Sequence, residues 1–71
     1  MQIHFILVEP AVPENVGAAA RAIKTMGFNS LRLVNTKVHL DKKASWLAHA
    51  SNEILETAEE FNTLKEATND I

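Results

Sequence analysis

Residues 3–34 read IHFILVEPAVPENVGAAARAIKTMGFNSLRLV, and this stretch decides the fold. The run from Ile3 to Val8 is almost wholly apolar, which is typical of a strand buried on both faces of a parallel sheet. Two prolines within residues 9–14 then predict a loop, because they remove backbone donors and stop regular structure. Residues Leu31 to Val34, which are apolar except for Arg32, predict another short buried strand.

The segment between these two runs predicts a helix that ends near Met26 and has Asn15 as its N-cap. Gly27 suits the left-handed position just beyond a helix end. One narrow stripe of this helix should face the sheet, and it consists of Val16, Ala19, Ala20, Ile23 and Gly27. A strand, a helix and a strand in this order form a right-handed parallel unit in nearly all proteins, so the predicted fold class is α/β.

The rest of the chain predicts smaller elements. After a loop at residues 35–40, Asp41 can cap a second helix, whose apolar face would be Ala44, Leu47 and Ala48 with Leu40 as a hydrophobic staple. Ile54-Leu55 predicts a turn of helix, and residues 58–61 predict an acidic edge strand. Thr63 and Glu66 have the spacing of a capping box at the start of another helix.

Length and composition predict one small packed domain over residues 1–71. A chain of 71 residues is near the lower limit for a self-sufficient core, and the absence of cysteine removes disulfides as support. The same absence agrees with a reducing cytoplasm, where we expect the protein to be located. The longest apolar run, Phe5 to Val8, is far shorter than the roughly 20 residues of a membrane span, so no membrane partner is expected.

Charge is unevenly distributed along the chain. Up to Asn52 six Lys or Arg residues accompany three acids, whereas from Glu53 onward six acids accompany one lysine. This pattern permits a phosphate-facing side in the first part, while the acidic part faces water or a protein. Ordinary solvated helix faces would also explain it.

The loop at residues 9–14 and the helix after it should lie where open α/β sheets bind ligands, at the carboxyl ends of the strands. A helix N-terminus attracts phosphate, and Gly17 would allow a close approach to the backbone. A single glycine does not make a dinucleotide fingerprint, so a phosphate-rich polymer is favoured over NAD. Arg21 lies about 140° around the helix from Val16, away from the sheet. It is either an ordinary surface arginine or, with Asn15, a grip for a phosphate and a ribose hydroxyl.

Other polar and aromatic residues give weaker signals. His4, His39 and His49 lack metal-ligand spacing, so they are interpreted as structural or solvent-exposed, and no metal is predicted. Trp46 could stack on an RNA base, although packing in a core or an interface is the favoured interpretation. Lys42 and Lys43 are candidate phosphate contacts, with a solvated face as the alternative.

The string N-x-G-x-x-x-R from Asn15 to Arg21 resembles the first motif of SpoU-type RNA methyltransferases of the SPOUT superfamily. The flanking Val8-Glu9-Pro10, residues 24–28 and residues 31–35 strengthen this resemblance, which extends through Trp46-Leu47-Ala48 and Ser51 over essentially the whole chain. Such enzymes methylate ribose 2′-hydroxyls of tRNA or rRNA with S-adenosylmethionine. The resemblance therefore implies the N-terminal half of an α/β-knot domain, a three-layer parallel-sheet βαβ arrangement in which the knot itself is absent.

The same resemblance implies roles for individual residues. Arg21 and Asn15 would be catalytic, and the RNA-binding set would be Glu14, Gly17, Arg21, Lys42 and Lys43. Because arginine loses its proton only above about pH 12, an electrostatic role for Arg21 is favoured over that of a base. The family's second and third motifs, which hold S-adenosylmethionine, have no counterpart in the chain, so no cofactor-binding residue is assigned.

The resulting hypothesis is the N-terminal part of an RNA ribose 2′-O-methyltransferase that acts on tRNA or rRNA and forms a homodimer. The chain alone is expected to bind no cofactor and to transfer no methyl group. Two alternatives stay open from the residues alone. One is a free-standing small α/β module that binds RNA or protein without catalysis, and the other is a subunit that only supports oligomer formation.

Overall fold

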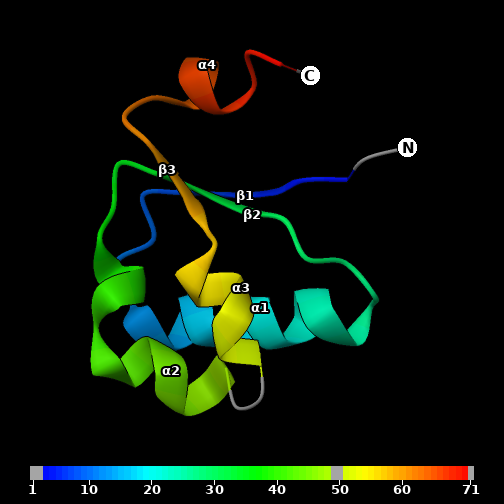
Figure 1. The fold of residues 1–71 in the computed structure, drawn as a ribbon. Helices are drawn as coiled ribbons and strands as arrows, with labels where there is room; N and C mark the ends of the chain where they lie inside the picture. Colours follow the sequence, from blue (N-terminus) through cyan, green and yellow to red (C-terminus); the bar gives the residue numbers. More distant parts are fainter. Residues whose placement is uncertain (1–2, 49–50, 71) are drawn as a thin grey trace.

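Three parallel strands form the centre of the molecule in a computed structural model, which describes residues 3–48 and 51–70. Helices lie on both sides of this sheet (Figure 1): α4 covers one side, and α1, α3 and the more distant α2 lie on the other. The predicted three-layer parallel α/β fold is confirmed. The elements are β1 Phe5–Val8, α1 Pro13–Thr25, β2 Leu31–Val34, the 3₁₀ helix η1 Val38–Leu40, α2 Lys42–Ala48, α3 Asn52–Glu56, β3 Glu59–Phe61 and α4 Leu64–Ala67.

The central strand is β2, and it pairs with β1 on one side and β3 on the other. All four residues of β2 are buried, as the apolar run predicted. The prediction that β1 is buried on both faces is wrong, since its residues are half-buried or exposed. The physical reason is position, because in the described chain β1 pairs with β2 alone and lies at the edge of the sheet.

Helix α1 begins earlier than its sequence predicted. Its first residue is Pro13 and its N-cap is Val12, which makes no side-chain capping bond. A proline fits the first helical position because it lacks an N–H that would have no partner there, and its φ is already helical. Asn15 is therefore the third residue of the helix and is exposed, so its prediction as the N-cap is wrong.

The end of α1 follows the prediction for Gly27, whose φ is +86°. The Gly27 N–H donates to the Lys24 carbonyl at 2.9 Å, and the Phe28 N–H donates to the Ile23 carbonyl at 3.0 Å. These two bonds are those of a Schellman motif, which satisfies the last carbonyls of a helix.

The buried stripe of α1 differs from the predicted one. Ala19 is half-buried and Gly27 is exposed, whereas Gly17 is buried. A Cβ atom built on Gly17 would lie 1.9 Å from the Ala44 carbonyl oxygen of α2. The glycine therefore lets α1 and α2 approach closely. The helical periodicity of α1 predicts which face meets the sheet, but it does not reveal that α2 packs against another face.

Helix α2 presents a narrow apolar face to the core. Asp41 caps it as predicted, since its Oδ1 accepts from the Lys43 N–H at 2.9 Å. Ala44 and Ala48 are buried, but Leu47 is 40% exposed and the predicted staple residue Leu40 is 70% exposed, so that staple is wrong. Trp46 is 60% exposed, which excludes the core packing that was one of its predicted roles.

The C-terminal elements agree with their predictions in type and place. The turn of helix is α3, and the acidic strand β3 occupies the other edge of the sheet. Thr63 caps α4, with its Oγ1 accepting from the Glu66 N–H at 3.2 Å. The Glu66 carboxylate accepts from Asn62 rather than from Thr63, at 3.1 Å, so only half of the capping box forms. Across the described residues, no helix is long and apolar enough to cross a membrane.

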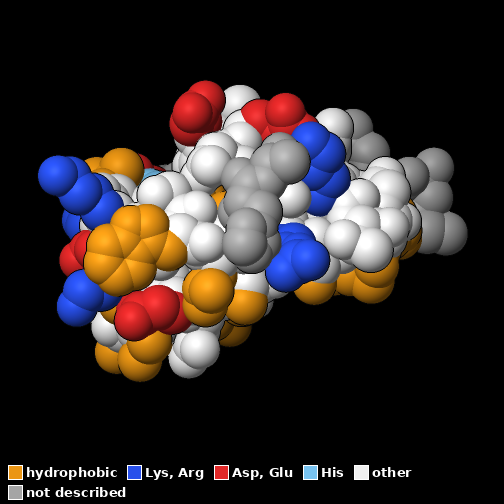
Figure 2. Space-filling view, turned by 90° about the horizontal axis from the view of Figure 1, so that it is seen from below, with side chains coloured by type: hydrophobic (Ala, Val, Ile, Leu, Met, Phe, Trp, Pro, Cys, Tyr) orange, Lys and Arg blue, Asp and Glu red, His pale blue; other side chains and the backbone are white. Residues whose placement is uncertain are grey.

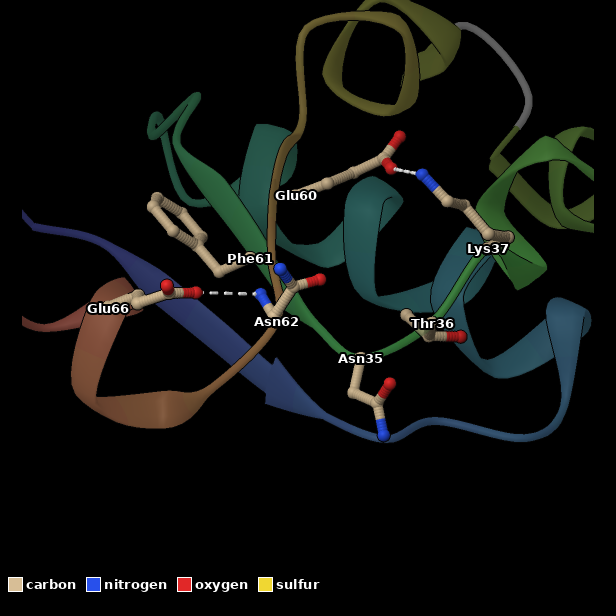
Figure 3. A pocket seen from close by; sticks show the side chains of 7 residues that line it. All are labelled: Asn35, Thr36, Lys37, Glu60, Phe61, Asn62 and Glu66. Carbon is tan, nitrogen blue, oxygen red and sulfur yellow. Dashed lines mark hydrogen bonds and ion pairs between the residues drawn. The ribbon is translucent and has the colours of Figure 1, made fainter.

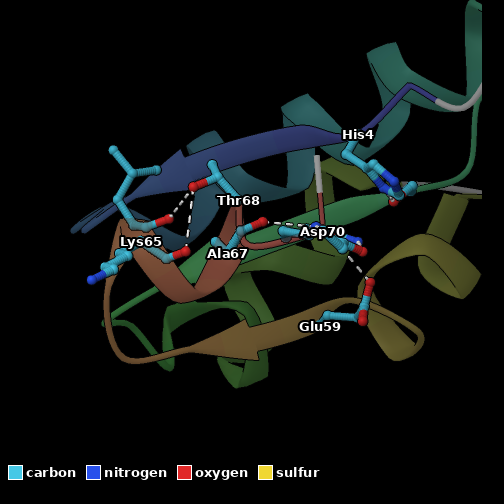
Figure 4. A network of polar contacts seen from close by, with 9 residues as sticks. His4, Glu59, Lys65, Ala67, Thr68 and Asp70 are labelled. Atoms are coloured by element: carbon cyan, nitrogen blue, oxygen red, sulfur yellow. Dashed lines mark hydrogen bonds and ion pairs between the residues drawn. The ribbon is translucent and has the colours of Figure 1, made fainter.

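A buried arginine joins α4 to the sheet, and sequence reasoning missed it. Arg32, in the middle of β2, is 4% exposed. Its guanidinium donates to both carboxylate oxygens of Asp70, at 2.6 and 2.8 Å, and to the Ala67 carbonyl at 2.7 Å (Figure 4). Glu59 lies at 3.3 Å from the Arg32 Nε, and the Phe61 ring lies below the guanidinium carbon with its centroid at 5.6 Å. The hydrogen bonds from Arg32 lower the pKa of Asp70 to about 2.

Replacing Asp70 with asparagine should lower the thermal unfolding midpoint of the full-length protein by several degrees at pH 7. Because the pKa of folded Asp70 lies below its usual 3.8, its ion pair contributes stability above about pH 4 and loses it as the pH falls toward 2. The difference between the wild type and Asp70→Asn should therefore narrow over that range. Thermal unfolding of both proteins, monitored by circular dichroism at pH 7, 4 and 3, measures this difference in midpoint. The control is Glu56→Gln, and a difference that stays constant with pH would contradict the assignment.

Candidate functional site

The loop between β1 and α1 lies beside the carboxyl end of β2. The Glu9 N–H donates to the Val34 carbonyl at 2.9 Å, and the Thr36 hydroxyl donates to the Pro10 carbonyl at 3.0 Å. Glu9 and Asn35, the first residues after β1 and β2, both have positive φ values, 49° and 52°. Left-handed non-glycine residues are uncommon and cluster at functional sites. This edge is the place where the sequence predicted a ligand.

Helix α1 carries Glu14, Asn15 and Arg21 away from this edge. Glu14 is half-buried, while Asn15 and Arg21 are exposed, so the prediction that Arg21 points away from the sheet is confirmed. Six positions separate Asn15 from Arg21, which is about 9 Å along a helix axis. No hydrogen bond joins them within the described ranges, and the two side chains would have to contact different groups of one ligand.

Arg21 lines a groove of about 450 Å³ between α1 and α2. Its other lining residues are mostly apolar: Ala18, Ala22, Thr25, Met26 and Leu47. Arg21 is the charged residue of this lining and is itself exposed, so an anion bound in the groove would meet its guanidinium.

The packing of Gly17 contradicts the role that the sequence predicted for it. It was predicted to let a phosphate or ribose approach the backbone, but it is buried and its α-carbon faces the backbone of α2. Its burial against α2 argues against a contact between Gly17 and RNA.

The acidic second part of the chain neutralises some of the bases and leaves others without a carboxylate. Lys24 pairs with Glu53, and Lys37 with Glu60. Arg32 is held by the acids described above. Within residues 3–48 and 51–70, no ion pair reaches three of the predicted RNA contacts, namely Arg21, Lys42 and Lys43.

A second, polar hollow of about 670 Å³ lies at the carboxyl ends of β2 and β3 (Figure 3). Glu60 is its centre, since it accepts from Lys37 and lies 3.0 Å from the Nε2 of the buried His39. The hydrogen bond from Lys37 is the main cause that lowers the pKa of Glu60. Two carboxylates and one lysine line the hollow, so it does not favour phosphate. Its lining is Asn35, Thr36, Lys37, Glu60, Phe61, Asn62 and Glu66.

The two described histidines, His4 and His39, make structural contacts with neighbouring side chains. His4 bonds the Ser30 hydroxyl at 2.6 Å, and His39 packs in η1 against Glu60. His49 lies outside the described residues. In the described part of the chain, no group of His, Asp or Glu side chains could hold a metal ion.

Solved structures with the same arrangement define the class. The crystal structure of a "probable methyltransferase" from Bordetella pertussis Tohama I superposes with a TM-score of 0.94 and 41% identity, over 99% of this chain and 43% of that one. The crystal structure of TrmJ from Z. mobilis ZM4 gives a TM-score of 0.91 and 35% identity, over 99% of this chain and 32% of that one. The parallel α/β arrangement of the chain is that of SPOUT methyltransferases.

The sequence model of the SpoU rRNA Methylase family matches residues 2–71, so the chain belongs to that family. LasT of Escherichia coli K12, described as an uncharacterized tRNA/rRNA methyltransferase, is 49% identical over the whole chain. The tRNA (cytidine-2′-O-)-methyltransferase TrmJ of Methanocaldococcus jannaschii is 38% identical, also over the whole chain. The chain spans 31% of the length of each of these two relatives.

Proposed function

We propose that the full-length protein transfers a methyl group to a ribose 2′-hydroxyl of tRNA or rRNA, and that this chain supplies part of the RNA-facing side of the active site. The observation that carries the proposal is the environment of Arg21. It lies on the exposed face of α1, in the string that resembles the first motif of the family, and no carboxylate neutralises it within the described residues. S-adenosylmethionine would supply the methyl group, and no residue of this chain is assigned to hold it.

The role proposed for Arg21 is electrostatic. During the reaction the ribose oxygen forms a bond to the methyl carbon, the sulfur–methyl bond breaks, and the hydroxyl proton leaves for a phosphate or water. Negative charge builds on the ribose oxygen as its proton departs, and a fixed guanidinium stabilises this charge. Its planar donors also suit a neighbouring phosphate, which would hold the ribose in place.

Asn15, Glu14 and the two lysines of α2 have supporting roles in this proposal. Asn15 is exposed in the first turn of α1, where its amide can orient a ribose or phosphate group. Glu14 is half-buried beside it and shapes the helix start. Lys42 and Lys43 would contact the RNA backbone and set its register without reading sequence. A homodimer in a cytoplasmic location, where tRNA and rRNA meet such enzymes, completes the proposal.

A labelled-methyl assay tests this function. The full-length protein with tritiated S-adenosylmethionine should label tRNA or rRNA at a ribose 2′-oxygen and leave DNA of the same sequence unlabelled. The 71-residue chain alone should transfer no label and should give no heat in a calorimetric titration with S-adenosylmethionine. A full-length protein that binds RNA yet transfers nothing would instead indicate a binding module. Tight cofactor binding by the short chain would show that this chain itself holds a cofactor site.

A further inference from the structure

Trp46 projects from the outer face of α2 into solvent. It is the single tryptophan of the chain, and 60% of it is exposed. The buried residues of the same helix, Ala44 and Ala48, face α1. At 100° per residue, Trp46 lies about 160° around the helix from Ala44, which is almost opposite the packed face. The exposed indole is therefore available to a partner outside the described chain.

Two lysines flank this indole on the same helix. Lys42 is four residues before Trp46 and Lys43 is three residues before it, so both are its neighbours on the helix surface. Neither lysine has an ion pair within the described ranges, and Asp41 directs its Oδ1 to a backbone N–H of α2. The outer face of α2 thus combines one aromatic ring with two cations that no described carboxylate neutralises.

This surface adjoins the groove that contains Arg21. Leu47, the residue after Trp46, lines that groove together with Arg21. Figure 2 views this side of the molecule and shows hydrophobic side chains exposed among Lys and Arg, with some acidic side chains between them. A chain bound in the groove could therefore continue onto α2 without crossing the core.

We propose that Trp46, Lys42 and Lys43 form a stacking platform for one unpaired base of the RNA substrate. The indole would stack on the base, and the two ammonium groups would contact the phosphates on either side of it. Aromatic rings between cations are the usual means of holding single-stranded nucleic acid. An apolar protein surface would have to desolvate both lysines, whereas RNA supplies a phosphate for each. The proposal rests on the proposed function and extends it to loops or other unpaired segments of the RNA.

The test measures RNA binding by the full-length protein through tryptophan fluorescence. Binding of tRNA or rRNA should quench emission in the wild type, and the share of the quench that Trp46 contributes should be lost in Trp46→Phe. Trp46→Ala should weaken RNA binding about tenfold, as expected for loss of one stacked base, while Trp46→Phe should recover most of the affinity. Lys42→Ala and Lys43→Ala should each lower the salt dependence of binding by about one counterion. Leu64→Ala and Lys65→Ala on α4 are the matched controls.

The outcomes separate this proposal from the proposed function. Methyl transfer with no quench, and with unchanged affinity in Trp46→Ala, would overturn the platform and leave the proposed function intact. A loss of RNA binding in Trp46→Ala without any methyl transfer by the wild type would support the platform and count against the enzyme. A changed sedimentation coefficient in Trp46→Ala, with RNA affinity unchanged, would make this face a protein interface and would also overturn the platform.

Discussion

Replacing Arg21 with alanine in the full-length protein is expected to lower methyl transfer to RNA by about 10²–10³-fold, the usual effect of removing one group that stabilises charge in a transition state. The fold should be unaffected, because Arg21 is exposed and its side chain is not part of the packed face of α1. The measurement is the rate of tritiated-methyl incorporation at saturating RNA, with the thermal unfolding midpoint recorded alongside.

Two further variants of α1 sharpen this test. Arg21→Lys keeps the charge but loses the planar pair of donors, so it should recover only part of the activity. Lys24→Ala, one turn further along the helix, removes a cation that is already paired with Glu53 and should change the rate less than twofold. Equal activity in Arg21→Ala and the wild type would mean that Arg21 is an ordinary surface residue.

The sequence predicted the frame of the fold because that frame depends on local patterns. The mostly apolar run at Leu31 to Val34 marks a buried strand, and Gly27 marks a helix end that needs a positive φ. Asp41 and Thr63 cap their helices through bonds that reach only a few residues along the chain. Such features need no knowledge of distant contacts, and the structure confirms each of them.

Some features that the sequence did not reveal depend on contacts between distant parts of the chain. Arg32 occupies the centre of an apolar strand only because Asp70 and Glu59 reach it from the acidic C-terminal part. A basic residue inside a buried run, together with that acidic excess, was the signal that could have indicated the pair. Trp46 does not pack in a core of the described residues, because it lies on the outer side of α2, and its packing in an interface stays a prediction.

The sequence predicted only part of the candidate site, because local patterns place its residues on the helix but do not reveal their distant contacts. Helical periodicity places Arg21 outside the core, and the structure confirms that position. Periodicity could not show which cations would be neutralised, because Lys24, Arg32 and Lys37 find their acids through folding. It also could not distinguish a glycine needed by a ligand from one needed by a second helix, which is the error made at Gly17.

Gly17→Ala should destabilise the protein strongly for a change of one methyl group. The added Cβ would lie 1.9 Å from the Ala44 carbonyl oxygen and 3.2 Å from the Ala48 nitrogen, so α2 must move away from α1. Overpacking of this kind costs about 3 kcal/mol, while the better helix propensity of alanine returns about 1 kcal/mol. We expect a net loss of about 2 kcal/mol in the free energy of unfolding, measured by urea denaturation of the full-length protein.

The neighbouring position supplies the control for this change. Ala18 is exposed, so Ala18→Ser adds an atom of similar size without touching α2 and should cost only about 0.5 kcal/mol. Hydrogen exchange should then show which contact fails: in Gly17→Ala the amides of α2 should exchange faster, while those of β2 keep their protection. Because α2 carries Trp46 and both lysines of the proposed platform, the same variant should also weaken RNA binding. A Gly17→Ala protein as stable as the wild type would mean that α1 and α2 are not packed as closely as the structure shows, and that Gly17 is free to meet a ligand after all.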